Sequence, residues 1–248
     1  MDIANYRQSA KEMASILGLG RLPVGVRFLP PWEAFPGEAR RLERYRYCQA
    51  LMRAGQGESV ILDKAGIACP AAAAAFGFRP LPEGLKSGKG LVGFGIVADP
   101  EVGKRMFENM PRLAAGQIAA LHLFPLERTV HPPDIITVED EVERLMWIAL
   151  AALHVGGGKR LRATTAVLQA TCVDAAVIPL LEKRLNFCYG CYGCRDATDI
   201  KGSEAVLGFP MEMLPAIVEH LAFLRQKAIP ASRAKGAFSE LKRRRSEG

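Results

Sequence analysis

The chain has 248 residues, of which 49% are apolar and 24% charged, and its net charge is +7. This composition is that of a soluble globular protein with a substantial core and excludes a disordered chain. No apolar run reaches the roughly 18 residues of a membrane span, and residues 1–7 lack a secretory apolar region. We therefore expect a cytoplasmic protein without membrane association, whose six cysteines bind metal or do chemistry rather than form disulfides.

The first half of the chain alternates apolar runs of strand and helix period, separated by glycine and proline. One predicted helix carries Cys48 and another carries Cys69, and proline at residue 100 begins a third in its favoured position. The expected elements are a helix over 5–18, a strand over 22–29, a helix over 40–54, a strand over 59–62, a helix over 63–76, a strand over 91–98, a helix over 100–110 and a strand over 117–124.

The second half repeats this order, with a glycine run at 156–158 in the place of the earlier break at 55–57. The expected elements are a strand over 134–138, a helix over 139–155, a strand over 160–164, helix over 165–184, the lead-in 185–187 to a cysteine loop, and a helix over 211–226. We predict an α/β fold, a mixed sheet with flanking helices, and an internal duplication as a hypothesis. Under that hypothesis Cys69 and Cys172 are equivalent.

The domain organisation follows from where these patterns stop. Residues 1–230 are expected to form one globular domain, with pseudo-repeats over 20–125 and 133–228. Residues 231–248 lack apolar periodicity and hold the basic run 242–245, so we expect a flexible basic tail. A basic tail is most often solvated, and a nucleic-acid partner is therefore not expected.

Three cysteines at a three-residue step are the most informative motif. Cys188, Cys191 and Cys194 form two overlapping Cys-x-x-Cys units, the spacing with which bacterial-type ferredoxins bind a cubane iron–sulfur cluster. Gly190 and Gly193 precede the second and third cysteine and leave backbone N–H groups free to face sulfide. The motif predicts a [4Fe–4S] cluster.

Zinc is the competing metal, because tetrahedral thiolate sites also use Cys-x-x-Cys. Structural zinc ribbons usually place two such units on knuckles about 15 or more residues apart. In this chain the units overlap and share Cys191, which favours a cubane over a zinc knuckle.

A cubane needs a fourth ligand from upstream, and the chain offers Cys48, Cys69 and Cys172. Cys69 precedes a proline at an expected helix start, a position that lowers a thiol pKa. Cys172 lies in a polar segment, and a free cysteine can also simply pack in a core. The sequence favours Cys69 or Cys172 and leaves the choice open.

Arg195 follows the last cysteine directly, and we consider it as a cofactor-binding residue. A four-thiolate cubane is anionic, so an adjacent guanidinium would raise its potential or bind an anionic ligand. A surface ion pair of Arg195 with Asp196 or Glu204 is the alternative. No catalytic residue can be assigned, because the usual hydrolase, metalloprotease and dinucleotide motifs are absent from the sequence.

Several short motifs resemble the prokaryotic family catalogued as domain of unknown function 169. They are PVGV at 23–26, YCQA at 47–50, IACP at 67–70, FG at 76–77, NF at 186–187, GCR at 193–195 and GFP at 208–210. The resemblance covers about residues 10–225 and implies an anaerobic prokaryotic source, which suits an oxygen-sensitive cluster. It implies no established reaction. The triple motif is fuller than the family's usual pattern, so the resemblance implies that the more general ligands of the family include Cys48, Cys69 and Cys172.

These observations together predict a cytoplasmic iron–sulfur protein that acts in electron transfer or in reduction of a small substrate, and leave open whether it is an oxidoreductase. The expected partners are a redox protein or a small molecule, and a homo-oligomer is compatible with the sequence. The alternatives are a non-redox ligand-binding or sensing module and a zinc-stabilised interaction protein.

Overall fold

A seven-stranded mixed sheet forms the centre of the fold in the computed structural model, which describes residues 2–166 and 171–246. The strands are β1 (Val24–Leu29), β2 (Arg40–Arg41), β3 (Val60–Asp63), β4 (Ala120–Pro125), β5 (Ile135–Glu141), β6 (Asn186–Cys188) and β7 (Glu204–Pro210). Their order across the sheet is β2-β3-β4-β1-β5-β7-β6, and all neighbours except β2 and β3 are antiparallel. The α/β class with a mixed sheet is therefore confirmed.

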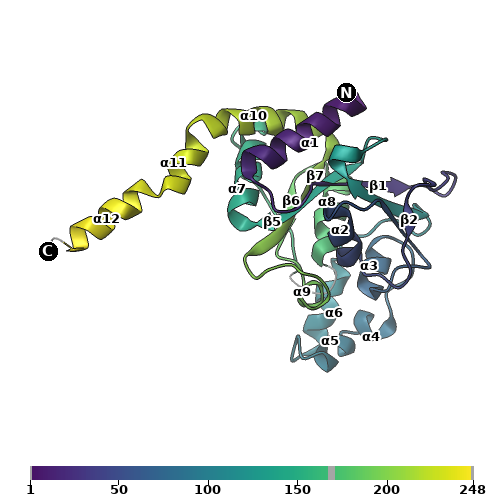
Figure 1. Ribbon diagram of the computed structural model, residues 1–248. Helices are drawn as coiled ribbons and strands as arrows, with labels where there is room; N and C mark the ends of the chain where they lie inside the picture. Colours follow the sequence, from purple (N-terminus) through teal and green to yellow (C-terminus); the bar gives the residue numbers. More distant parts are fainter. Residues whose placement is uncertain (1, 167–170, 247–248) are drawn as a thin grey trace.

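Helices cover both faces of the sheet (Figure 1). They are α1 (Ile3–Leu17), α2 (Tyr47–Gly55), α3 (Pro70–Ala75), α4 (Glu83–Lys86), α5 (Lys89–Gly93), α6 (Pro100–Glu108), α7 (Val142–Val155), α8 (Asp174–Glu182), α9 (Tyr192–Ala197), α10 (Leu214–Gln226), α11 (Ala228–Ala234) and α12 (Gly236–Ser246). Short 3-10 turns are η1 (Leu126–Arg128), η2 (Thr171–Val173) and η3 (Met211–Met213). None of the helices described is long and apolar enough to cross a membrane.

Two apolar cores lie on opposite faces of the sheet. Side chains alternate along β7, so that Val206 packs with α2, α3 and α8 while Leu207 and Phe209 pack with α1, α7 and α10. The first core extends down to α4, α5 and α6, which Figure 1 shows as a small helical layer below the sheet. All six cysteines lie on the side of this first core.

Most expected elements of the first half are confirmed, but two helices begin later than predicted. Residues 40–46 are not helical and lie beside 59–68, with Tyr45 N–H donating to the Gly66 carbonyl (3.0 Å) and Ala68 N–H to the Tyr45 carbonyl (2.8 Å). Helix α2 therefore starts only after Arg46, whose backbone N–H donates to Oε1 of Gln49 (2.9 Å), and α3 starts at its proline.

The expected strand over 91–98 is wrong, because these residues form the end of α5 and a loop. Leu91 is buried, but Val92 and Phe94 are exposed, as in a helix packed on one side. A Cβ at Gly88 would lie 1.9 Å from the Pro100 carbonyl oxygen, so glycine allows α5 to pack closely on α6. A short apolar run cannot by itself distinguish the two structures.

The expected strand over 160–164 is also wrong. This segment is exposed and has no regular structure. Its end is held by the side chain of Asn186, whose Oδ1 accepts from the Thr164 N–H (2.8 Å) and whose Nδ2 donates to the Thr164 carbonyl (3.0 Å). The helix predicted over 165–184 is present as η2 and α8, while residues 167–170 lie outside the described residues. Strands β6 and β7 and helices α9, α11 and α12 were not predicted.

The two halves place their strands in matching order about the β1–β5 pair. β1, β4 and β3 run outward on one side, and β5, β7 and β6 run outward on the other. The middle strands β4 and β7 both end in Phe-Pro and are followed by a 3-10 turn. The N–H of the first residue in each turn donates to the carbonyl of the residue that precedes β1 or β5. These bonds join Leu126 to Pro23 (2.8 Å) and Met211 to Asp134 (3.2 Å). An ancestral duplication itself stays a hypothesis.

His122 of β4 is a buried titratable group whose pKa shift predicts a pH dependence. Its Nε2 lies 2.9 Å from Ser59 Oγ, and burial together with the charge of Arg27 lowers its pKa from 6.5 to about 4. A histidine with a lowered pKa in the folded state contributes stability above its ordinary pKa and loses it as the pH falls towards the folded value. We expect the free energy of unfolding to fall by about 3 kcal/mol between about pH 6.5 and about pH 4, and we expect this fall to be absent in His122→Gln.

Urea unfolding of both proteins at about pH 7.5 and about pH 4.5 measures the effect. Ser59→Ala is the control, because it removes the hydrogen bond but leaves the titration in place. An unchanged pH dependence in His122→Gln would show that other groups cause it.

Candidate metal centre

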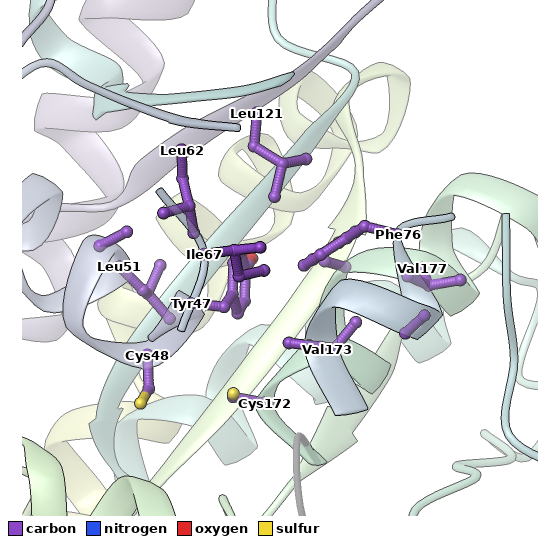
Figure 2. Close-up of a cluster of buried hydrophobic side chains, with 14 of the residues drawn as sticks. Tyr47, Cys48, Leu51, Leu62, Ile67, Phe76, Leu121, Cys172, Val173 and Val177 are labelled. Carbon is purple, nitrogen blue, oxygen red and sulfur yellow. The ribbon is translucent and has the colours of Figure 1, made fainter. Parts of the chain in front are cut away.

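Cysteines from three separate parts of the chain meet below the sheet. Cys48 is in the first turn of α2, Cys172 lies in η2, and Cys194 is in the first turn of α9. Their sulfurs all lie within 4.8 Å of one another, and all three side chains are buried. Figure 2 shows Cys48 and Cys172 beside each other at the edge of the apolar cluster that surrounds Tyr47. These three cysteines could hold a metal.

Cys191 adjoins this group through Cys194. Their sulfurs lie 3.4 Å apart, and the backbone N–H of each donates to the sulfur of the other, at 3.2 and 3.3 Å. Cys191 thereby caps the start of α9, and Gly190 before it has a φ of +74°, which lets the chain turn from β6 into the helix. The backbone thus brings a Cys-x-x-Cys pair to the edge of the centre.

Hydrogen bonds among the thiols set their acidity. Bonds from Cys172 and Cys194 lower the pKa of Cys48 to about 5, against the effect of burial. Hydrogen bonds with Cys194 and Cys48 raise the pKa of Cys172 well above its ordinary value. The bond from Cys172 lowers the pKa of Cys194. Hydrogen bonding among the thiols thus favours the thiolate form of Cys48, the form in which cysteine binds metal.

A cavity of about 390 Å³ opens beside the sulfurs. Five of the six cysteines line it, because Cys69, at the start of α3, and Cys191 join Cys48, Cys172 and Cys194. The other lining residues are Arg46, Tyr47, Ala68, Pro70, Ala72, Pro82, Gly84, Leu85, Gly90, Phe94, Tyr192 and Gly193. Two of the three upstream cysteines, rather than one, thus lie with Cys194, and the third lines the same cavity.

Cys188 occupies a different position from the other two cysteines of the triple motif. It is fully buried in β6, opposite Val206 of β7, and it is not among the described residues that line the cavity. Burial raises the pKa of its thiol, which favours the neutral form. Because the chain is extended through Cys188 and helical at Cys194, the regular spacing does not bring all three sulfurs to one point.

Arg195 supports the loop after α9. Its guanidinium donates to the carbonyls of Lys201 (2.7 Å), Tyr189 (2.5 Å) and Glu204 (3.1 Å). These bonds tie the two ends of the cysteine loop together. Arg195 is not among the described residues that line the cavity, so a direct role in cofactor binding stays a prediction.

Arg46 is the lining residue that sequence reasoning missed. It comes directly before Tyr47 and Cys48, and its Nη1 donates to the Gly193 carbonyl at 2.8 Å, joining α2 to α9. A basic residue next to a candidate cysteine was the signal available in the sequence. The helical layer that closes the cavity, with Leu85 and Phe94, could not be found because one of its helices was predicted as a strand.

The fold and the site define an α/β protein with a buried cysteine centre that could hold a metal. The chain belongs to the family DUF169, described as "Uncharacterised ArCR, COG2043", whose model matches residues 12–220. The resemblance inferred from the short motifs is thus confirmed, and the matched span contains all the cysteines.

A relative in Methanocaldococcus jannaschii, the uncharacterized protein MJ0308, is 31% identical over 231 residues, which cover 91% of this chain and 97% of the relative. No solved structure matches the chain significantly.

Proposed function

We propose that this protein binds one [4Fe–4S] cluster in the cysteine-lined cavity and acts in redox chemistry. The observation that carries the proposal is the convergence of Cys48, Cys172 and Cys194, whose sulfurs lie within 4.8 Å, at a cavity that Cys69 and Cys191 also line. The cubane would supply one-electron transfer, either to a partner protein or to a small substrate.

The cysteine sulfurs and the cavity beside them fit an iron–sulfur cluster. The donors are all cysteine sulfurs, the ligands that iron–sulfur clusters and zinc prefer. A single zinc ion is bound by sulfur at about 2.3 Å and needs no adjoining space. The cavity of about 390 Å³ leaves room for a larger group, which favours the cubane over zinc.

The surrounding residues have defined tasks in this proposal. Cys48, Cys172 and Cys194 are the core ligands, and Cys191 or Cys69 supplies the fourth sulfur. Arg46 offsets the negative charge of the thiolates from the edge of the cavity. The apolar walls limit access of water, which raises the strength of charge interactions inside.

We also infer that the two halves of the chain descend from a duplication, which the matching strand orders support. In this correspondence Cys48 precedes β3 as Cys172 precedes β6, and Cys69 follows β3 as Cys191 follows β6. The pairing therefore differs from the one expected from sequence, which matched Cys69 with Cys172. In this correspondence each half of the chain supplies two cysteines, Cys48 and Cys69 from the first half and Cys172 and Cys191 from the second.

We propose that this chemistry takes place in the cytoplasm, a reducing compartment in which clustered cysteines bind metal. Its partner would be a redox protein or a small molecule, and a homo-oligomer is compatible with either. A zinc-stabilised interaction module is the second candidate, because buried thiolates alone also suit zinc.

Anaerobic purification followed by an absorption spectrum and analysis of iron, sulfide and zinc tests the proposal. We expect a brown protein with a broad absorption band in the visible region and equal amounts of iron and sulfide, lost on exposure to air. A colourless protein with one zinc per chain would overturn the redox function and leave the zinc module. Unfolding on chelation would then confirm a structural role for that zinc.

A further inference from the structure

We propose that the outer part of the cysteine-lined cavity binds a compact apolar molecule with one carboxylate, which Arg46 recognises. This inference names the substrate class of the same site and rests on the proposed function. It concerns the part of the cavity between Arg46 and the side chains of α4 and α5.

The outer wall of the cavity is apolar. Pro82, Leu85 and Phe94, from the helical layer of α4 and α5, line it. This layer is held in place by close backbone packing, since a Cβ at Gly88 would clash with the Pro100 carbonyl of α6. None of these side chains can bind a metal, and together they give this part of the cavity an apolar surface on which an apolar group can pack.

Arg46 is the one permanently charged side chain among the described residues that line the cavity. Its Nη1 donates to the Gly193 carbonyl (2.8 Å), which fixes the guanidinium beside α9, and the same atom lies 3.9 Å from a carboxylate oxygen of the exposed Asp196. A guanidinium has five N–H donors in a planar fork, so donors remain for a carboxylate. This cation therefore gives the apolar chamber a single anion-binding point.

Charge and size then fix how such a molecule would lie. Arg46 is the cation among the described lining residues, so the carboxylate lies at Arg46 and the apolar body lies against Leu85 and Phe94. Phe94 and Tyr192 line the cavity yet are 56% and 51% exposed, which places them at its opening. A cluster at the sulfurs would take up part of the cavity of about 390 Å³, so the remaining space admits only a compact molecule.

Calorimetry on the full chain, purified anaerobically with its metal, tests the proposal with benzoate as the probe and benzyl alcohol as its neutral counterpart. We expect benzoate to bind more tightly than benzyl alcohol and Arg46→Gln to weaken benzoate binding about tenfold or more, because a charged hydrogen-bonded pair is lost. Lys86→Gln is the matched control, since it removes the same charge from exposed α4 outside the cavity.

A second variant tests the chamber without touching Arg46. Leu85→Trp should fill the apolar part and abolish benzoate binding, whereas Val92→Trp, on α5 outside the cavity, should leave it unchanged. Absence of benzoate binding to metal-loaded wild-type protein, or equal binding by Arg46→Gln, would overturn the proposal and leave the cavity to the cluster alone. Benzoate binding that depends on Arg46 in a protein without metal would instead support this site and refute the proposed function.

Discussion

Cys172→Ser is expected to lose its bound metal during anaerobic purification. The sulfur of Cys172 lies in the buried group with Cys48 and Cys194, and serine offers no thiolate to replace it. Even residues that only support metal ligands cost about 10–100-fold in affinity when replaced, so loss of a ligand should weaken retention at least that much. Iron, sulfide and zinc analysis per folded chain measures the effect, and Cys48→Ser should behave in the same way.

Cys188→Ala is the matched control for this experiment. Cys188 belongs to the triple motif, but it is buried in β6 and is not among the described residues lining the cavity. We expect this variant to keep its metal and to be destabilised by about 1 kcal/mol through lost packing. Loss of metal in Cys188→Ala together with retention in Cys172→Ser would show that the ligands follow the motif spacing rather than the grouping of sulfurs.

Gly208→Ala is expected to cause the largest loss of stability. Gly208 lies in β7, and a Cβ there would be 1.7 Å from the Ala175 carbonyl oxygen of α8. Both atoms belong to backbone, so the clash can be relieved only by moving α8 away from the sheet. Such overpacking costs about 1–3 kcal/mol, and we expect the upper end because no side chain can yield.

The displacement of α8 should also reach the metal centre. Cys172 lies in η2, directly before α8, so Gly208→Ala should lose metal as well as stability. Thermal unfolding and metal analysis measure the two effects. Gly202→Ala is the control, since its Cβ would meet no atom within 4 Å. Full metal content in a destabilised Gly208→Ala protein would show that η2 is held independently of α8.

Local signals in the sequence were sufficient where a residue acts on its neighbours. The sequence predicts that a helix begins at Pro100, and α6 does begin there, where Asp99 caps it by accepting a hydrogen bond from the Glu101 N–H. The short apolar runs of β1 and β5 likewise predicted the central strands. Such features depend on a few adjacent residues, and their expected ends lie near those observed.

Prediction failed where a distant partner decides the local structure. Residues 40–46 have a helical apolar pattern, yet they are not helical because Tyr45 pairs with the backbone of Gly66 and Ala68. The segment 160–164 has the apolar alternation of a strand but finds no neighbouring strand, and it is held by the side chain of Asn186. Backbone hydrogen bonding between remote segments outweighs weak local preferences.

The sequence by itself determined the class of fold, the family, and the presence of a thiol-rich site, because cysteine number, spacing and short motifs are properties of the chain. Only the tertiary structure decided which sulfurs meet. Cys48, Cys172 and Cys194 come together because α2, η2 and α9 pack on one face of the sheet, while β6 keeps Cys188 in the core beside them. Ligand grouping thus depends on the direction in which each backbone segment projects its side chains, and spacing along the chain does not specify that direction.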